Sequence, residues 1–259
     1  MRLGIAGIAF AVSCAASPPP QAANDGEALY RKMEAALAGA KNLEVTFDSS
    51  TDGPGSARIT GKFKIEAGNK LAMKIEGLVG VKKYTLELAC DGAKMNLKRT
   101  ETPPPPVPLE AQPELPAPGT LATNVAAALA RGGAWLAQEF ADGEYRAVAD
   151  PYFEERQQAK DEKRPMKPLP AVAPRDATAL HTLENFRLGK PDGGATPVTY
   201  DLTRKGEKVA LVTTVTVWVD SKSSLPLRRE GAIFAKTSEG KAGGAALSNW
   251  TEKYQAKTD

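Results

Sequence analysis

The sequence predicts an α+β fold in which helices cover the concave face of a curved, unclosed antiparallel β-sheet or barrel. Short segments with alternating apolar and polar side chains follow one another between residues 43 and 97, and five more lie between residues 180 and 255. Strands so close in sequence must pair antiparallel, because a parallel crossover needs a dozen or more residues. Helical patterns precede the first group and separate the two groups. Runs of strands segregated from helices are typical of this fold class.

The first folded element is a helix over residues 24–40. Asn24 or Asp25 can cap its first turn, and Gly39 and Asn42 mark its end. Its apolar side chains recur at helical spacing. This stripe consists of Leu29, Met33, Ala36, Leu37 and Ala40.

The first group of strands alternates most clearly in residues 58–66. Ile59, Phe63 and Ile65 share one face there, and polar side chains occupy the other. Asp91-Gly92 is a strong hairpin signal. Turn-forming residues also separate the other segments. The predicted strands are residues 43–50, 58–66, 71–76, 84–90 and 95–97.

Helices and two proline-rich loops form the middle of the chain. Residues 101–119 contain eight of the twenty prolines and therefore predict an extended loop rather than a central strand or a helix. Residues 121–140 predict a helix that Gly132-Gly133 can kink, and a short helix follows at 144–149. Residues 159–174 predict a second proline-rich loop.

The last third of the chain returns to strands. Turn residues separate segments with strand patterns. Residues 209–219 are apolar on both faces, which favours a strand covered on both sides. The predicted strands are residues 180–188, 198–204, 209–220, 227–237 and 246–255.

The first 23 residues predict an export signal followed by a tether. Met1-Arg2 precedes an apolar run over residues 3–12, which is too short to cross a bilayer but fits a secretory signal. Ala11-Val12-Ser13-Cys14 resembles a bacterial lipobox, in which Cys14 would carry a lipid anchor. Cleavage near Ala15, Ala16 or Ala23 is the alternative. An exported, periplasmic protein is therefore expected, membrane-anchored only if Cys14 is lipidated.

Residues for catalysis or metal binding are scarce. The only histidine, His181, lies in a strand pattern, and neither a Gly-x-Ser-x-Gly elbow nor a nucleotide-binding glycine motif occurs. The acidic pairs Glu154-Glu155 and Asp161-Glu162 lie among Lys, Gln and Pro, as solvated surface charges do. The net charge of +3 does not indicate nucleic acid as a partner. The sequence predicts no enzyme, no metal site and no cofactor.

The strongest functional feature is an apolar concave surface beneath the helix over residues 121–140. Packed core is one interpretation of this surface. The other is a cavity that binds the hydrocarbon chain of a lipid. The predicted lining residues are Ile59, Phe63, Ile65, Leu71, Met73, Ile75, Leu86, Leu88, Leu129, Trp135 and Leu136.

Three segments resemble the periplasmic outer-membrane lipoprotein carrier family, the LolA-like proteins with their relatives LolB and RseB. Residues 61–74 (GKFKIEAGNKLAMK) look like the family's first strand-turn-strand, and residues 88–95 (LACDGAKM) look like its Asp-Gly hairpin. Residues 218–228 (WVDSKSSLPLR) look like its late hairpin with Leu-Pro. The family's lid-latching arginine has no basic counterpart in Glu66-Ala67-Gly68, so delivery through that latch is not expected here.

The resemblance implies one LolA-like domain over residues 24–259, with a cavity for the acyl chains of a lipid or lipoprotein. We therefore expect a non-catalytic, carrier-like protein of the cell envelope that is not an integral membrane protein. The alternative is a lipid-anchored module that recognises or senses an envelope protein and has a filled interior.

Overall fold

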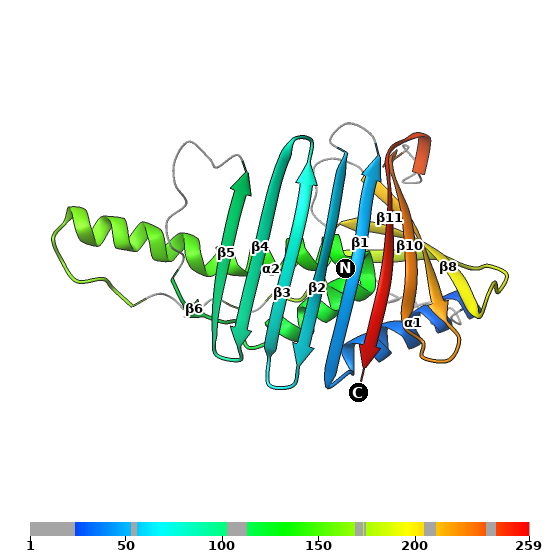
Figure 1. Cartoon of the computed structure of the whole chain (residues 1–259), viewed down its shortest axis with the longest axis horizontal. Coiled ribbons are helices and arrows are strands. Elements are labelled where there is room, and N and C mark those ends of the chain that lie inside the picture. Colours follow the sequence, from blue (N-terminus) through cyan, green and yellow to red (C-terminus); the bar gives the residue numbers. More distant parts are fainter. Residues whose placement is uncertain are drawn as a thin grey trace, which may run out of the picture.

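One antiparallel sheet of eleven strands, with two helices against one face, makes up the part of the chain that the structure describes (Figure 1). The computed structural model describes residues 24–52, 56–102, 113–168, 173, 175–204, 211–236 and 242–258; the predicted leader, including Cys14, lies outside them. The helices are α1 (Asp25–Ala38) and α2 (Leu121–Asp161). The strands are β1 (Asn42–Asp52), β2 (Ala57–Glu66), β3 (Lys70–Val79), β4 (Lys82–Asp91), β5 (Lys94–Thr102), β6 (Leu115–Pro116), β7 (His181–Leu188), β8 (Ala195–Arg204), β9 (Leu211–Asp220), β10 (Pro226–Lys236) and β11 (Ala242–Thr258).

The first and last long strands of the chain are neighbours in the middle of the sheet. The strand order is β6-β5-β4-β3-β2-β1-β11-β10-β9-β8-β7, and the pairing of Phe47 with Tyr254 joins the two groups of strands. The two edge strands, β6 and β7, do not pair with each other, so the sheet is unclosed. The predicted fold class is confirmed.

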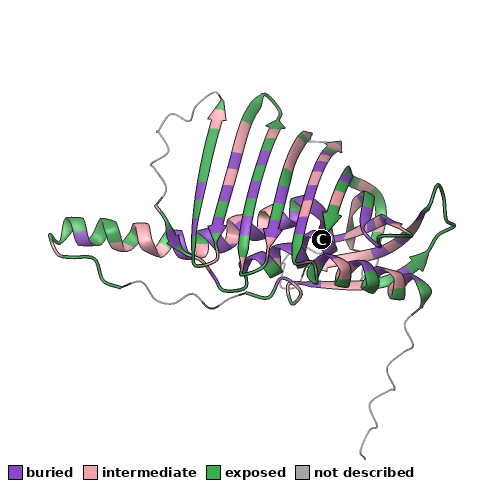
Figure 2. Ribbon diagram, turned by 60° about the horizontal axis from the view of Figure 1, so that its bottom comes forward, coloured by how far each residue is buried: buried purple, intermediate pink, exposed green. Residues whose placement is uncertain are grey.

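The inner face of the sheet is built by alternation of buried and more exposed residues along β1–β5. A continuous row of opposed residues runs from Val45 through Phe63, Met73 and Leu88 to Leu97, and all five are buried. Figure 2 shows this alternation of buried and exposed positions along the strands. The outward neighbours are mostly charged or polar, so burial of the aliphatic row drives the helices onto one face only.

Helix α1 packs beside β7, β8 and the first half of α2. The side chain of Asn24 caps it by accepting a hydrogen bond of 2.9 Å from the Glu27 amide. Tyr30 is buried on its inner face, where its ring lies 5.2 Å from the ring of Phe186 and 4.8 Å from that of Tyr200. The predicted helix at this position is confirmed.

Helix α2 has 41 residues and is broken at Gly133, whose backbone angles are φ 84° and ψ −164°. The predicted kink at Gly132-Gly133 is therefore confirmed. The separate short helix predicted at 144–149 is wrong, because the chain re-enters the helix directly after the break. The helix continues to Asp161, three residues into the predicted second loop, and its end projects beyond β5 (Figure 1).

The turn between β2 and β3 holds the start of α2. Asn69 has a left-handed backbone (φ 63°), and its side-chain oxygen accepts a hydrogen bond of 2.9 Å from the Ala122 amide. The Asn69 side-chain nitrogen donates to the carbonyls of Pro118 at 2.9 Å and Gly92 at 3.2 Å. This asparagine thus satisfies an amide that the first turn of the helix leaves free.

Two expectations for loops and strands need correction. The residues 101–119 do not form one loop, because Glu101 and Thr102 end β5 and Leu115–Pro116 forms β6. The segment 209–219, which was expected to be covered on both sides, is β9 from Leu211 onward. Its residues Thr214, Thr216 and Trp218 are only partly buried, because both helices lie on the other face of the sheet.

Candidate functional site: a cavity at the helix break

A cavity of about 370 Å³ lies between the inner face of the sheet and the break in α2. Eight strands and the helix contribute to its wall, which is mainly apolar with several hydroxyl groups. Such a volume is at the lower end of the range for small-molecule sites. The lining residues are Ser49, Thr51, Ala57, Ile59, Val79, Tyr84, Gly132, Trp135, Leu136, Gln138, Leu202, Thr213, Ile233, Ser248, Trp250 and Glu252.

Two aromatic rings in the wall lie over glycines of the neighbouring strand. A Cβ atom on Gly231 would be 2.2 Å from the Trp250 ring, and a Cβ atom on Gly77 would be 2.2 Å from the Tyr84 ring. Both pairs are directly opposed in the sheet. Because a glycine leaves the strand surface bare, each ring can lie flat on the sheet and leave space above it for a ligand.

Arg229 caps the C-terminal end of the first half of α2. Its two terminal guanidinium nitrogens donate to the carbonyls of Leu129 at 2.5 Å and Ala130 at 2.6 Å, and the side chain is fully buried. The Tyr200 hydroxyl donates to the Arg131 carbonyl at 2.6 Å. A cation at this position suits the partial negative charge of a helix C-terminus.

Glu252 caps the N-terminal end of the second half of α2, just after the break. Its carboxylate accepts hydrogen bonds from the amides of Ala134 at 3.0 Å and Trp135 at 3.3 Å, and the Tyr254 hydroxyl also donates to it. Both carboxylate oxygens are therefore already bonded. An acid suits the partial positive charge of a helix N-terminus. A Cβ atom at position 133 would lie 2.2 Å from this carboxylate, so the break requires glycine.

Burial governs the protonation of these groups. It raises the pKa of the Glu252 carboxyl, while the hydrogen bond from Tyr254 and the charge of Arg229 oppose that effect. Burial also raises the pKa of Tyr254 well above its usual value and that of Tyr200 to about 12. Both hydroxyls therefore stay protonated at neutral pH and remain available as donors.

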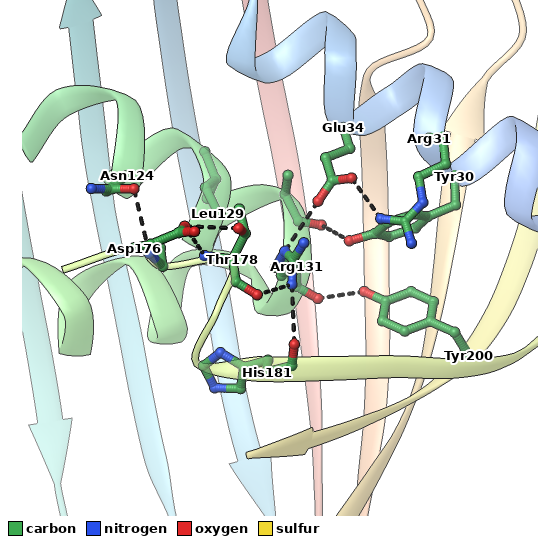
Figure 3. A network of polar contacts seen from close by, with 12 residues as sticks. Tyr30, Arg31, Glu34, Asn124, Leu129, Arg131, Asp176, Thr178, His181 and Tyr200 are labelled. Carbon is green, nitrogen blue, oxygen red and sulfur yellow. Dashed lines mark hydrogen bonds and ion pairs between the residues drawn. The ribbon is translucent and has the colours of Figure 1, made fainter. Parts of the chain in front are cut away.

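Arg131, two residues before Gly133, connects the break to the surrounding elements (Figure 3). Its guanidinium group donates to the Glu34 carboxylate of α1 at 3.1 Å and to the carbonyls of Thr178 at 2.7 Å and His181 at 3.2 Å. The Tyr30 hydroxyl adds a 3.2 Å hydrogen bond to the Ala130 carbonyl. Side chains from α1, β8, β10 and β11 thus hold this short segment of α2.

The structure places three of the eleven predicted lining residues in the cavity wall: Ile59, Trp135 and Leu136. Trp135 is 57% exposed and lies at the open side. The other eight are buried in the hydrophobic core, where they pack without contributing to this cavity. They are Phe63, Ile65, Leu71, Met73, Ile75, Leu86, Leu88 and Leu129.

The charged pair, Arg229 and Glu252, and most of the polar residues of the wall were not predicted from the sequence. A signal was present in the sequence. Arg229 alternates with Gly231 and Ile233 and so shares their face of the strand, and Glu252 shares a face with Trp250 and Tyr254. A charged residue on the face that a strand is expected to bury has two explanations. Either it is paired with an opposite charge in the interior, or the strand is shifted by one residue so that this face is exposed. Only the pairing of Arg229 with Glu252 across β10 and β11 decides between the two.

The remaining polar candidates lie away from the cavity. His181 is buried on β7 with 7% of its surface exposed, and the Glu155 carboxylate accepts hydrogen bonds from Arg164 near the end of α2. Among the described residues, His, Cys, Asp and Glu side chains form no group of three that could hold a metal. No described helix is long and apolar enough to cross a membrane.

No protein-family model and no curated protein matches this chain. Solved structures to which it is similar include LprF from Mycobacterium bovis (8% identity, TM-score 0.37, 89% of this chain and 91% of that one). A LolA superfamily protein from Nitrosomonas europaea is also similar (10% identity, TM-score 0.27, 92% and 94%). The family named from the sequence motifs is therefore among the structures found.

The structure of the Pseudomonas aeruginosa MucA/MucB complex is similar as well (11% identity, TM-score 0.33). The match covers 90% of this chain but 57% of that chain, so this chain spans little more than half of it. Scores of this size establish no shared ligand or partner.

Proposed function

We propose that this chain is a non-catalytic binding protein of the cell envelope that holds the hydrocarbon part of a lipid in the cavity at the α2 break. The observation that carries this proposal is a mainly apolar cavity, open on one side, between the sheet and a helix whose break is built into the fold. Each buried methylene contributes about 0.8 kcal/mol, so a lipid chain can gain on the order of 10 kcal/mol before ordering costs. Binding of this kind needs no catalytic group.

A carrier-like role in the periplasm follows from the same proposal together with the predicted export signal. The exposed ring of Trp135 at the open side would be the first contact of an entering chain. A second candidate is recognition of an envelope protein. The end of α2 favours it, because this end projects beyond β5 and offers a surface that the sheet does not cover (Figure 1).

Lipid extraction and uptake test the proposal. Protein purified from its native host is extracted with organic solvent, and the extract is examined by mass spectrometry. Delipidated protein is then titrated with a fluorescent fatty acid. The proposal expects a co-purified lipid and saturable uptake at one site. Protein that carries no lipid and takes up none would favour the protein-recognition role.

A pair of variants on one strand locates the site. Ile59→Glu places a charge in the cavity wall, and we expect it to weaken uptake at least tenfold. Thr60→Glu is the matched control, because residue 60 faces the opposite side of β2 and lies outside the wall. Circular dichroism establishes that both variants are folded. Equal uptake by the two folded variants would place the ligand elsewhere.

A further inference from the structure

We infer that the ligand is a single-chain amphiphile, with one alkyl or acyl chain of about a dozen carbons, and not a lipid or lipoprotein with two or three chains. This inference rests on the proposed function and narrows it to one chemical class. Three features carry it: the volume of the cavity, the charged pair at its inner end, and the filled core beside it.

The volume limits the number of chains. A methylene group takes about the same space as a water molecule in the liquid, roughly 30 Å³. The cavity of about 370 Å³ therefore holds a dozen such groups. Two chains of sixteen carbons would need roughly 1,000 Å³ on the same scale. Two long chains would therefore exceed the cavity, and much of their length would lie outside its open side.

The inner end of the cavity cannot move without breaking the charged pair. Glu252 lines that end, and its two oxygens are already bonded to α2 and to Tyr254. Arg229, opposite Glu252 in the sheet, holds two carbonyls of α2. A longer cavity would leave a buried charge without its partners, which is strongly unfavourable.

The inner face of β2–β4 offers no second chamber. A separate hollow of about 370 Å³ lies between β5 and the second half of α2, and its wall is rich in charged side chains such as Arg99, Glu101 and Arg146. Phe63, Met73 and Ile75, which might line one, are at most 2% exposed and belong to the packed core. Well-packed cores do not admit additional methylene groups without displacing side chains. A second chain therefore has no apolar place along β2–β4 beside the first.

One polar atom in the wall is suited to the head group of the ligand. The side-chain oxygen of Gln138 is buried and has no hydrogen-bond partner among the described residues. Gln138 lies next to Tyr84 in the wall, on the side of the exposed Trp135 and Val79. The Gln138 amide group shares a hydrogen bond with Tyr84, so only its oxygen lacks a partner. A buried oxygen without a donor is costly, and a hydroxyl on the head group of the ligand would satisfy it.

A chain-length series tests the inference. The probes are saturated fatty acids and monoacylglycerols of 8 to 18 carbons, and phosphatidylglycerol with two chains of 16 carbons. Each displaces a bound fluorescent fatty acid, and native mass spectrometry gives the stoichiometry. We expect affinity to rise roughly fourfold per methylene and to level off near twelve carbons. The two-chain lipid should bind at least tenfold more weakly than the twelve-carbon probe.

Affinity that keeps rising to 18 carbons, or two-chain lipid bound one to one with equal affinity, would overturn the inference and leave the proposed function intact. Failure of every probe to displace or bind would overturn the proposed function itself. The variant Ala57→Leu fills about three methylene volumes of the cavity and should shorten the optimal chain by about three carbons. Ala72→Leu, on the outer face of β3, should leave it unchanged; equal optima for both variants would also contradict the inference.

Discussion

Arg229 and Glu252 lie directly opposite each other on β10 and β11, and together they cap the two helix ends that meet at the break in α2. The arginine bonds the last carbonyls of the first half, and the glutamate bonds the first amides of the second half. One cross-strand pair therefore satisfies the backbone groups that the break exposes and matches both helix dipoles. Because the break forms part of the cavity wall, the same pair shapes the candidate site.

Removing one member of this pair should destabilise the fold strongly. Arg229→Met should cost about 3–5 kcal/mol, because it leaves a buried carboxyl group and two helix carbonyls without their partner. Glu252→Gln should cost less, because glutamine keeps a neutral acceptor for the helix amides. The double variant should cost clearly less than the sum of the two, since it leaves no unpaired charge. Urea unfolding measures all four proteins. Additive losses would show that the two side chains act independently.

Replacing Gly133 at the break should lower the free energy of unfolding by more than the strain of a positive φ alone. Gly133→Ala should lose about 3 kcal/mol or more, because φ is positive and the new Cβ atom meets the Glu252 carboxylate at 2.2 Å. Gly68→Ala is the matched control, since Gly68 also has a positive φ but open space around it. The control should lose about 1–2 kcal/mol. Equal losses in thermal or urea unfolding would argue against the clash.

The stability difference between the native protein and Glu252→Gln should depend on pH in a definite direction. The pKa of Glu252 is raised in the folded state. Its contribution is therefore complete below the pKa of the unfolded chain and falls as pH rises through the folded pKa. We expect the deficit of the glutamine variant to shrink from about pH 4.5 upward. A deficit that grows with pH would mean that Arg229 and the helix end outweigh burial.

Ligand binding should change the fluorescence of one tryptophan more than the others. Trp135 is 57% exposed in the cavity wall, and a bound chain should cover it. The emission should shift to shorter wavelength, and quenching by acrylamide should decrease. Trp218→Phe removes a tryptophan on the outer face and should keep the shift, while Trp135→Phe should leave only the smaller part that comes from Trp250 in the same wall. A shift that is undiminished in Trp135→Phe would place the chain away from this ring.

The sequence alone determined the first helix, most of the strands and which side of these strands faces inward, but not the length of α2 or the short strand β6. Alternation of apolar residues in β1–β5 specifies a strand with one buried face, because side chains alternate with a period of two. Gly132-Gly133 specified the helix break, because glycine tolerates backbone angles that end a helix. The predicted inward set in β2–β4 is buried, as alternation requires, but alternation does not distinguish a packed position from a cavity wall.

Only the tertiary structure decided where the cavity lies and what closes it. Arg229 and Glu252 are far from α2 in sequence, and they meet the break only because β1 pairs with β11, which places β10 and β11 in the middle of the sheet. A local pattern reports the environment of a residue but not its partner. The capping of a helix by two strands is a long-range contact, and it exists only after the chain has folded.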